Sequence, residues 1–369
     1  MHLRSLSLIN YKNIVQADID FSPKINCFIG VNGAGKTNVL DAIYYLSHCK
    51  SHSNSIDSQN IFHEGDFFVI QGNYLRNEQD EHIYCGLKRK QKKQFKRNKK
   101  EYDRLSEHIG LLPLVMVSPS DNELINGGSD ERRRFIDSII SQYDKAYLDV
   151  LIRYNNALQQ RNALLKSHTT DASLYEIWEE QMAIYGNEIY QKRLLFMNEF
   201  LPIFREYHKL LSLENEEVGL RYESSMQSGD AIQQLAASRE RDRLFGFSSK
   251  GTHKDDLEIT LGDFPIKRVG SQGQNKTCLV ALKLAQFDFL KKHGKITPIL
   301  LFDDIFDKLD TFRVEQIIAL VSEEHFGQIF ITDTNRRHLD EILAKISQQI
   351  RIFSVENGIV RIDNLTIDN

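Results

Sequence analysis

The chain has 369 residues, of which 41% are hydrophobic and 27% are charged, and its formal net charge is −4 at pH 7. This composition excludes a disordered chain and is typical of a globular protein, and the length favours two lobes that each bury a core. Because positive and negative charges nearly balance, any binding of nucleic acid must come from a local basic patch.

Targeting and redox signals are weak. The four cysteines lie far apart, none at metal-binding spacing, so we expect reduced core thiols. No apolar run approaches the roughly 20 residues that span a bilayer. The N-terminal segment alternates like a strand and lacks the apolar block of a secretory signal. We therefore expect a cytoplasmic protein without a membrane partner.

The N-terminal part, up to about residue 118, is predicted to consist of strands and hairpins with one helix near residues 38–48. Its predicted strands cover residues 3–9, 25–30, 67–75, 82–90 and 111–118.

From about Ser129, the predicted N-cap of a first helix, to about Leu244, the pattern is almost wholly helical. Pro202 is expected to kink or end a long helix, because proline lacks the amide that a helical turn requires. Trp178 is expected in the core with Leu174, Ile177 and Met182, which lie at helical spacing.

From about Phe245 strands and helices alternate again. Predicted strands cover residues 257–262, 298–304, 328–334 and 350–355, with helices at 277–293 and 314–324. Two of these strands are unbroken apolar runs, typical of a parallel sheet buried on both faces. We therefore predict an α/β protein whose sheet is completed by both ends of the chain. Residues 1–118 and 248–369 would form one lobe, and residues 119–247 a mainly helical insertion with short arms.

A complete phosphate-binding pattern, GVNGAGKT, lies between a predicted strand and a predicted helix. Its glycines let backbone amides face phosphate oxygens, its lysine reaches the β- and γ-phosphates, and its threonine offers a hydroxyl to Mg²⁺. The alternative, a glycine-rich turn that binds nothing, rarely has both flanking elements. The predicted ATP-binding residues are Gly30, Val31, Asn32, Gly33, Ala34, Gly35, Lys36 and Thr37.

Two carboxylates, Asp303 and Asp304, end an apolar strand. Ligands of open α/β sheets bind beyond the carboxyl ends of the strands, so both are expected to face the nucleotide. Asp303 would hold Mg²⁺ together with Thr37, and Asp304 would orient or deprotonate the attacking water. A solvated turn is the alternative for the pair taken alone.

A second candidate anion site, SQGQNK, opens the helix predicted at 277–293. A serine hydroxyl, a glycine amide and polar side chains at a helix start can donate to phosphate oxygens. One γ-phosphate could not easily use two such helix starts on one face, so the second is expected to serve the ATP of another molecule. Its residues are Ser271, Gln272, Gly273, Gln274 and Lys276.

These motifs together resemble the RecF family, whose ATPase heads are of the ABC type and similar to those of SMC proteins. The resemblance covers essentially the whole chain and rests also on the segments NYKN, SPSDNELINGGSDERRRFID, QQRNALLK, THKDDL and DKLD. It implies an ABC-type P-loop ATPase head with a mixed sheet, and two subunits that sandwich two ATP molecules head to tail.

The resemblance also implies weak, DNA-stimulated hydrolysis coupled to dimer opening, and a role in gap repair, recombination and the SOS response, with RecO and RecR helping to place RecA. It adds Asn13 and Asn38 to the nucleotide site and assigns Asp307 and Asp310 to the loop that follows the acidic pair. The family usually has an arginine at Lys12 and GPHRDD where this chain has GTHKDD, so Lys12 and residues 253–256 have no assigned role.

A dense basic run, KRKQKKQFKRNKK, lies in a predicted hairpin. It could neutralise DNA phosphates without reading sequence, although a solvated face is the alternative. The candidate DNA contacts are Lys88, Arg89, Lys90, Lys92, Lys93, Lys96, Arg97, Lys99 and Lys100. For Arg132, Arg133 and Arg134, which begin the helical insertion, a structural role is favoured over contact with DNA.

Two other functions remain open from the sequence. One is the nucleotide-binding subunit of a membrane transporter, and the other is a small-molecule kinase, for which an acceptor pocket and an arginine-bearing lid are not found.

Overall fold

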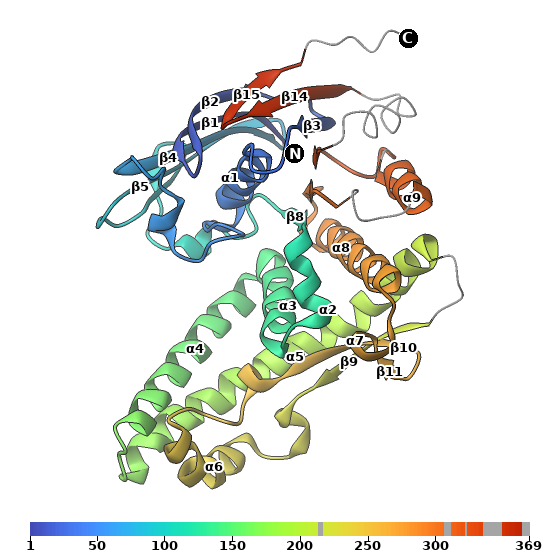
Figure 1. Ribbon diagram of the computed structural model, residues 1–369. Helices are drawn as coiled ribbons and strands as arrows, with labels where there is room; N and C mark the ends of the chain where they lie inside the picture. The colour runs from blue at the N-terminus through green and yellow to red at the C-terminus, as the bar shows by residue number, and fades with distance from the viewer. Residues whose placement is uncertain (213–216, 306–310, 322, 335–348, 364–369) are drawn as a thin grey trace. The chain divides into compact units, whose positions relative to one another are not determined.

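The computed structural model describes residues 1–212, 217–305, 311–321, 323–334 and 349–363. The chain forms two compact units: unit 1 comprises residues 1–121 and 286–369, and unit 2 comprises residues 122–285 (Figure 1). Residues 248–285, which the sequence assigned to the ATPase lobe, pack within unit 2 because their strand β10 (Asp256–Leu261) pairs with β9 (Val218–Glu223). The division therefore falls later in the chain than the change of sequence pattern.

Unit 1 carries two sheets and their covering helices. Its elements are β1 (His2–Tyr11), β2 (Ile14–Asp20), β3 (Ile25–Ile29), α1 (Lys36–His48), β4 (Phe67–Arg76), β5 (Gln79–Lys88), β6 (Gln94–Arg97), β7 (Lys100–Glu101), β8 (Leu114–Val117), β12 (Ile299–Asp303), α9 (Thr311–Val321), β13 (Ile329–Asp333), β14 (Ile350–Glu356) and β15 (Ile359–Ile362).

The second sheet of unit 1 joins strands from both ends of the chain, in the order β15-β14-β3-β13-β12-β8. All neighbours are parallel except β15, which pairs antiparallel with β14. The N-terminal strand β3 lies between the C-terminal strands β13 and β14, which confirms that both ends of the chain complete one sheet. Because these strands are parallel, β3, β12 and β13 end at the same edge.

The first sheet is antiparallel, in the order β2-β1-β4-β5-β6-β7. Helix α1 contacts strands of both sheets, and its Val39, Leu40 and Ile43 are fully buried. Burial of that apolar face fixes the helix start, and with it the phosphate loop, against the sheets. The four cysteines are buried and form no disulfide, as predicted.

Unit 2 is mainly helical. Its elements are α2 (Glu123–Asn126), α3 (Ser129–Tyr143), α4 (Lys145–Lys166), α5 (Ala172–Leu211), β9, α6 (Ala231–Phe245), β10, β11 (Phe264–Pro265), α7 (Ile266–Val269) and α8 (Gln272–Gly294), of which α8 ends in unit 1. Its three-stranded sheet has the order β11-β10-β9, and β9 lies where the sequence predicted helix. In the described part of the chain, no helix combines the length and the apolar character needed to cross a bilayer.

Two local predictions for this unit, those for Ser129 and Trp178, were wrong, and of the two outcomes expected at Pro202 the end of the helix does not occur. Ser129 is the first residue of α3, and Gly128 occupies the N-cap without a side-chain bond. Helix α5 continues through Pro202, because its buried face continues on both sides with Phe200 and Phe204, and their packing outweighs one lost hydrogen bond. Trp178 is only half-buried.

The neighbours chosen for Trp178 show the same error, since Leu174 and Ile177 are exposed and only Met182 is buried. Helical spacing indicated an apolar stripe correctly, but α5 buries a neighbouring stripe that includes Tyr175 and Glu179. Glu179 is buried because arginines neutralise it, a contact that apolar periodicity does not reveal.

Candidate nucleotide-binding site

The phosphate loop connects β3 to α1. At two of its positions a neighbouring residue lies so close that a glycine is needed. Gly35 caps α1 at φ 119°, a left-handed conformation, and a side chain there would meet Asn13 at 2.9 Å. A Cβ on Gly30 would lie 2.2 Å from the carbonyl oxygen of Val355 in β14. The tip residues Val31, Asn32 and Gly33 are exposed, so their amides are accessible to a ligand.

Lys36 lies under this loop, with only 3% of its side chain exposed. Its Nζ donates to the carbonyl oxygens of Gly30 at 2.8 Å and Val31 at 3.4 Å. It lies 3.9 Å from Oδ1 of Asp304. The ammonium is thus held at the position where the charge of a bound triphosphate would need neutralisation.

Thr37 and Asp303 meet although 266 residues separate them in sequence. The Thr37 hydroxyl donates to Oδ1 of Asp303 at 2.8 Å, and the Thr332 hydroxyl at the end of β13 donates to the same oxygen at 2.9 Å. Burial raises the pKa of Asp303, and the neighbouring Asp304 adds to this effect. A hydroxyl and a carboxylate are the hard oxygen ligands that Mg²⁺ prefers, and their placement fits the predicted metal site.

Asp304 has a left-handed backbone, with φ 45°, which is uncommon outside glycine but tolerated by aspartate. Its amide donates to the Thr332 hydroxyl at 2.9 Å, which fixes this turn at the end of β12. Its side chain is 26% exposed, so water can reach the carboxylate. Asp307 and Asp310, the other predicted residues of this segment, lie outside the described residues.

Asn13 and Asn38 brace the loop from the side. The Asn38 amide donates to Oδ1 of Asn13 at 2.7 Å, and Nδ2 of Asn13 donates to the Gly33 and Ala34 carbonyls at 3.3 Å. The turn between β14 and β15 adds a contact that sequence reasoning missed, since Gly358 N donates to the Ala34 carbonyl at 2.8 Å. The adjacent asparagine and glycine of this turn were the sequence signal from which the turn could have been predicted.

Lys12, whose role the sequence left unassigned, pairs with a buried carboxylate. Its Nζ lies 2.6 Å from Oδ2 of Asp41, which is 1% exposed and also accepts from Tyr11 and Ser51. Burial favours the protonated acid, but the Lys12 ammonium and these hydrogen bonds hold the pKa of Asp41 below its usual value. Lys12 therefore stabilises the fold beside α1.

The segment Ser271–Lys276 begins α8 in unit 2 with a capping box. Gln274 N donates to the Ser271 hydroxyl oxygen at 3.2 Å, and Ser271 N donates to Oε1 of Gln274 at 2.5 Å. Such a pair satisfies two helix-start amides that otherwise lack acceptors. A hydroxyl that accepts still carries its own proton, so Ser271 can donate that proton to a phosphate oxygen.

The basic run forms the predicted hairpin, and its nine cations divide into two that pair with acids of the fold, six that are exposed, and Lys96, whose Nζ lies 5.4 Å from the centroid of the Tyr84 ring. Lys93 is mostly buried and donates to Asp57 at 2.7 Å and to the Cys49 carbonyl at 2.6 Å, while Arg97 pairs with the buried Glu81. Both were predicted DNA contacts; Lys93 is mostly buried, whereas the Arg97 side chain pairs with Glu81 but remains 38% exposed. The exposed cations of the run are Lys88, Arg89, Lys90, Lys92, Lys99 and Lys100.

Two of the three arginines that begin α3 have the structural role favoured by the sequence, whereas Arg134 is exposed and pairs with Glu131. Arg132 donates to both carboxylate oxygens of Asp256 at 2.8 and 2.9 Å, and Arg133 is also buried and pairs with Asp130.

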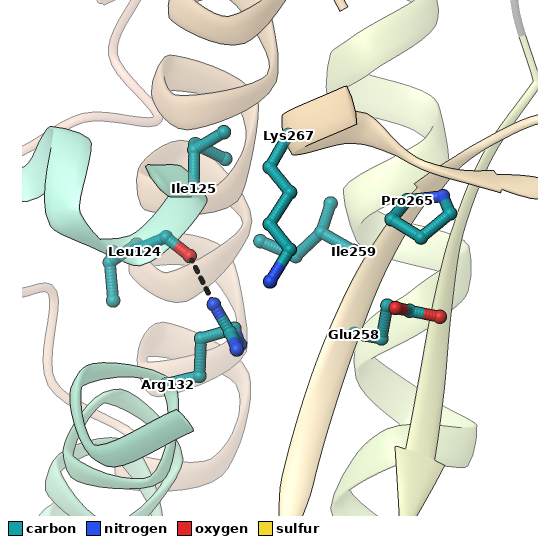
Figure 2. A pocket seen from close by; sticks show the side chains of 7 residues that line it. All are labelled: Leu124, Ile125, Arg132, Glu258, Ile259, Pro265 and Lys267. Atoms are coloured by element: carbon teal, nitrogen blue, oxygen red, sulfur yellow. Dashed lines mark hydrogen bonds between the residues drawn. The ribbon is translucent and has the colours of Figure 1, made fainter. Parts of the chain in front are cut away.

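Arg132 and Lys267 both point into a small pocket of unit 2 (Figure 2). Its volume of about 10 Å³ is too small for a nucleotide.

The phosphate loop after β3, the carboxylates that end β12 and the parallel sheet that carries both define an ATPase head of the ABC type. The RecF/RecN/SMC N-terminal domain family matches residues 2–361. The chain is 64% identical to a DNA replication and repair protein RecF of Phocaeicola vulgatus over 97% of both chains, and 62% identical to that of Parabacteroides distasonis over 98% and 99%. The chain belongs to the RecF family of DNA replication and repair proteins.

Solved structures agree with this assignment. A structure described as the recombination mediator protein RecF with ATP in the RecFOR pathway has a TM-score of 0.88 and 27% identity, and the match covers 98% of this chain and 97% of that one. An Smc head domain from Pyrococcus furiosus, with a TM-score of 0.59 and 19% identity over 100% and 97% of the two chains, shares the fold. These relatives do not favour a transporter subunit.

Proposed function

We propose that this chain binds ATP and Mg²⁺, dimerises on ATP and binds DNA at gaps, where it helps RecO and RecR to load RecA during repair and the SOS response. The observation that carries the proposal is the convergence of Lys36, Thr37, Asp303 and Asp304, with Thr37 and Asp303 only 2.8 Å apart. The family and the RecF structure with ATP support it.

In this proposal the loop amides and Lys36 hold the β- and γ-phosphates. Thr37 and Asp303 would hold Mg²⁺, which would supply positive charge to neutralise these phosphates. Asp304 orients the attacking water and accepts its proton, because its carboxylate is partly exposed and lies next to the Lys36 ammonium. Weak hydrolysis then ends the ATP-bound state.

The second copy contributes Ser271, Gln272, Gly273, Gln274 and Lys276 to the same γ-phosphate. The capping box turns the Ser271 hydroxyl toward the start of α8, where the helix dipole also favours an anion. Hydrogen bonds to charged groups contribute about 1.5–3 kcal/mol each, so two or three made only to the γ-phosphate favour the ATP dimer by several kcal/mol.

DNA would meet the exposed cations of the β5–β6–β7 hairpin. Lysine and arginine at such a surface bind phosphates and release counterions, which gives affinity without sequence preference. The preference for gapped DNA is proposed from membership of the RecF family.

Sedimentation of the whole chain with ATP, ADP and a non-hydrolysable ATP analogue, each with and without a gapped duplex, tests the proposal. We expect a monomer with ADP, a dimer with ATP or the analogue, and tighter DNA binding by the dimer. A chain that stays monomeric at high concentration with the analogue and DNA would refute the shared ATP site.

A further inference from the structure

The end of α6 in unit 2 exposes three large apolar side chains within four residues. Leu244 is 85% exposed, Phe245 57% and Phe247 45%, and the two phenylalanine rings stack with centroids 5.7 Å apart. We call residues 244–249 the display loop. Single exposed apolar residues are ordinary, whereas a cluster of this kind marks an interaction site.

Hydrogen bonds hold both ends of the display loop. Gly246 ends α6 in the left-handed region, at φ 72°, and its amide donates to the Asp242 carbonyl at 2.8 Å. The Ser248 amide and hydroxyl both donate to Oδ1 of Asn162 in α4, at 2.8 and 2.7 Å, and the Ser249 amide donates to the Asp242 carboxylate at 3.1 Å.

A buried charge network lies beneath these contacts. Arg161, which is fully buried, donates to Asp242 and to the Ser248 hydroxyl, each at 2.8 Å, and to Glu179 at 3.1 Å. His253 lies 3.0 Å from the Ser248 carbonyl through Nε2. The segments QQRNALLK and GTHKDD, which the nucleotide site does not use, thus meet at the base of the display loop (Figure 1 shows α4 and α6).

The buried charge network is better explained as a means of fixing one conformation of the display loop than as a source of folding stability. Buried ion pairs are often no more stabilising than apolar packing of equal volume. Here the ion pairs hold a polar loop base while leaving Leu244, Phe245 and Phe247 in water. The exposed side chains are therefore presented in one arrangement, which lowers the entropic cost of binding a partner.

Two cations, Lys254 and Arg241, contact the display loop, Arg241 by a 2.9 Å hydrogen bond to the Ser249 hydroxyl. Nζ of Lys254 lies 4.9 Å from the centroid of the Phe247 ring, and Arg241 and Lys250 flank the loop in sequence. The nearby carboxylate of Asp242 is neutralised by Arg161, and Glu240 is the exposed acid on the last turns of α6. The surface is thus apolar at its centre and basic at its rim.

We propose that the display loop docks a protein partner whose contact segment combines aromatic or aliphatic side chains with aspartate or glutamate. Buried aromatic and aliphatic anchors dominate protein interfaces, and charges at the rim select the partner and steer its approach. A protein segment is favoured over DNA because phosphates would leave three apolar side chains uncovered.

Panning a random peptide display library on the whole chain tests this proposal, with the L244S/F245S/F247S variant for counter-selection. We expect enriched peptides rich in Asp, Glu, Phe and Leu, which as synthetic peptides lose at least about tenfold in affinity for the serine variant. K250E/K254E should weaken the same peptides, and more strongly at low salt. Enrichment of basic peptides, or equal binding to the serine variant, would overturn the proposal.

Two further measurements separate this surface from other partners. The serine variant should keep the melting temperature and ATP affinity of the native chain, because its substitutions are exposed. Its affinity for a gapped duplex and its ATP-dependent sedimentation should also be unchanged. Loss of DNA binding would assign the loop to DNA, and loss of the dimer would assign it to a second copy; either result contradicts a separate protein partner.

Discussion

The Thr37 hydroxyl donates a 2.8 Å hydrogen bond to the Asp303 carboxylate and so joins the first turn of α1 to the end of β12. Thr332 holds the same carboxylate oxygen from β13 and also receives the Asp304 amide. A single threonine at the end of a neighbouring strand therefore positions both acids. Asp303 is buried and paired, whereas Asp304 is partly exposed. Mutations can therefore test the roles of the two carboxylates separately.

Replacing Lys36 by alanine should weaken ATP binding by at least an order of magnitude. The ammonium is already desolvated beneath the loop, and its loss removes at least one charge-assisted hydrogen bond to phosphate, about 1.5–3 kcal/mol or roughly 10- to 150-fold in affinity. Titration with a fluorescent ATP analogue measures the change, with the exposed Lys50→Ala as control. Native affinity in Lys36→Ala would contradict the assignment of the cradle.

Replacing Asp304 by asparagine should slow ATP hydrolysis by about 10²-fold or more while ATP binding and the dimer persist. The amide has nearly the same shape but accepts a proton from water far less well. Steady-state phosphate release and sedimentation measure the two effects separately, with the exposed Asp263→Asn as control. Native turnover in Asp304→Asn would remove this residue from the catalytic role.

Two substitutions in the capping box of α8 separate folding from phosphate binding. Gln274→Glu keeps the acceptor for Ser271 N, so the melting temperature should hold, but its negative charge opposes a γ-phosphate and should weaken the ATP dimer. Ser271→Arg should leave ATP binding by the monomer intact and block dimerisation. Light scattering that shows an ATP-bound dimer of Ser271→Arg would refute the shared site.

Acid should destabilise the chain partly through His253. Burial lowers the pKa of this side chain to about 4, and its neighbours are the Tyr154 hydroxyl and the Ser248 carbonyl. The unfolded chain binds the proton near pH 6.5 and the folded chain only near pH 4. The free energy of unfolding therefore falls between these values as pH drops, by up to about 1.4 kcal/mol per pH unit.

The variant His253→Gln removes this titration while keeping a donor and an acceptor. Urea unfolding at pH 7, 6, 5 and 4.5 should show a shallower loss of stability than in the native chain, although the variant is less stable at pH 7. His208, whose pKa burial also lowers to about 4, remains in both chains and is the internal reference. Parallel curves for the two chains would show that His253 does not titrate in this window.

Neutralising the exposed cations of the hairpin should weaken DNA binding without changing the fold. In K88Q/K92Q/K99Q/K100Q, the slope of log affinity against log salt should fall by about 0.9 for each DNA phosphate that the protein no longer neutralises. Lys93→Gln is the matched control from the same run, because its ammonium bonds Asp57 inside the fold and its loss should lower the melting temperature instead. An unchanged salt slope in the quadruple variant would place DNA elsewhere.

The fold and the chemistry of the phosphate loop could be predicted because their information is contiguous. A glycine-rich loop between a strand and a helix can be recognised within about ten residues. The same holds for an apolar strand that ends in two acids. Even so, where β9 lies and how α5 passes Pro202 were decided by packing, since buried side chains on both sides outweigh a local preference.

The sequence alone thus determined which residues could hold a triphosphate, because backbone amides, a lysine and a threonine act through local geometry. Only the tertiary structure decided how they are held and which charges remain in water. Thr332 reaches Asp303 from another strand, Lys93 is withdrawn from the basic surface by Asp57, and Arg161 and His253 meet beneath the display loop. A charge is neutralised by whichever partner folding brings within a few ångströms, and spacing along the chain does not encode that distance.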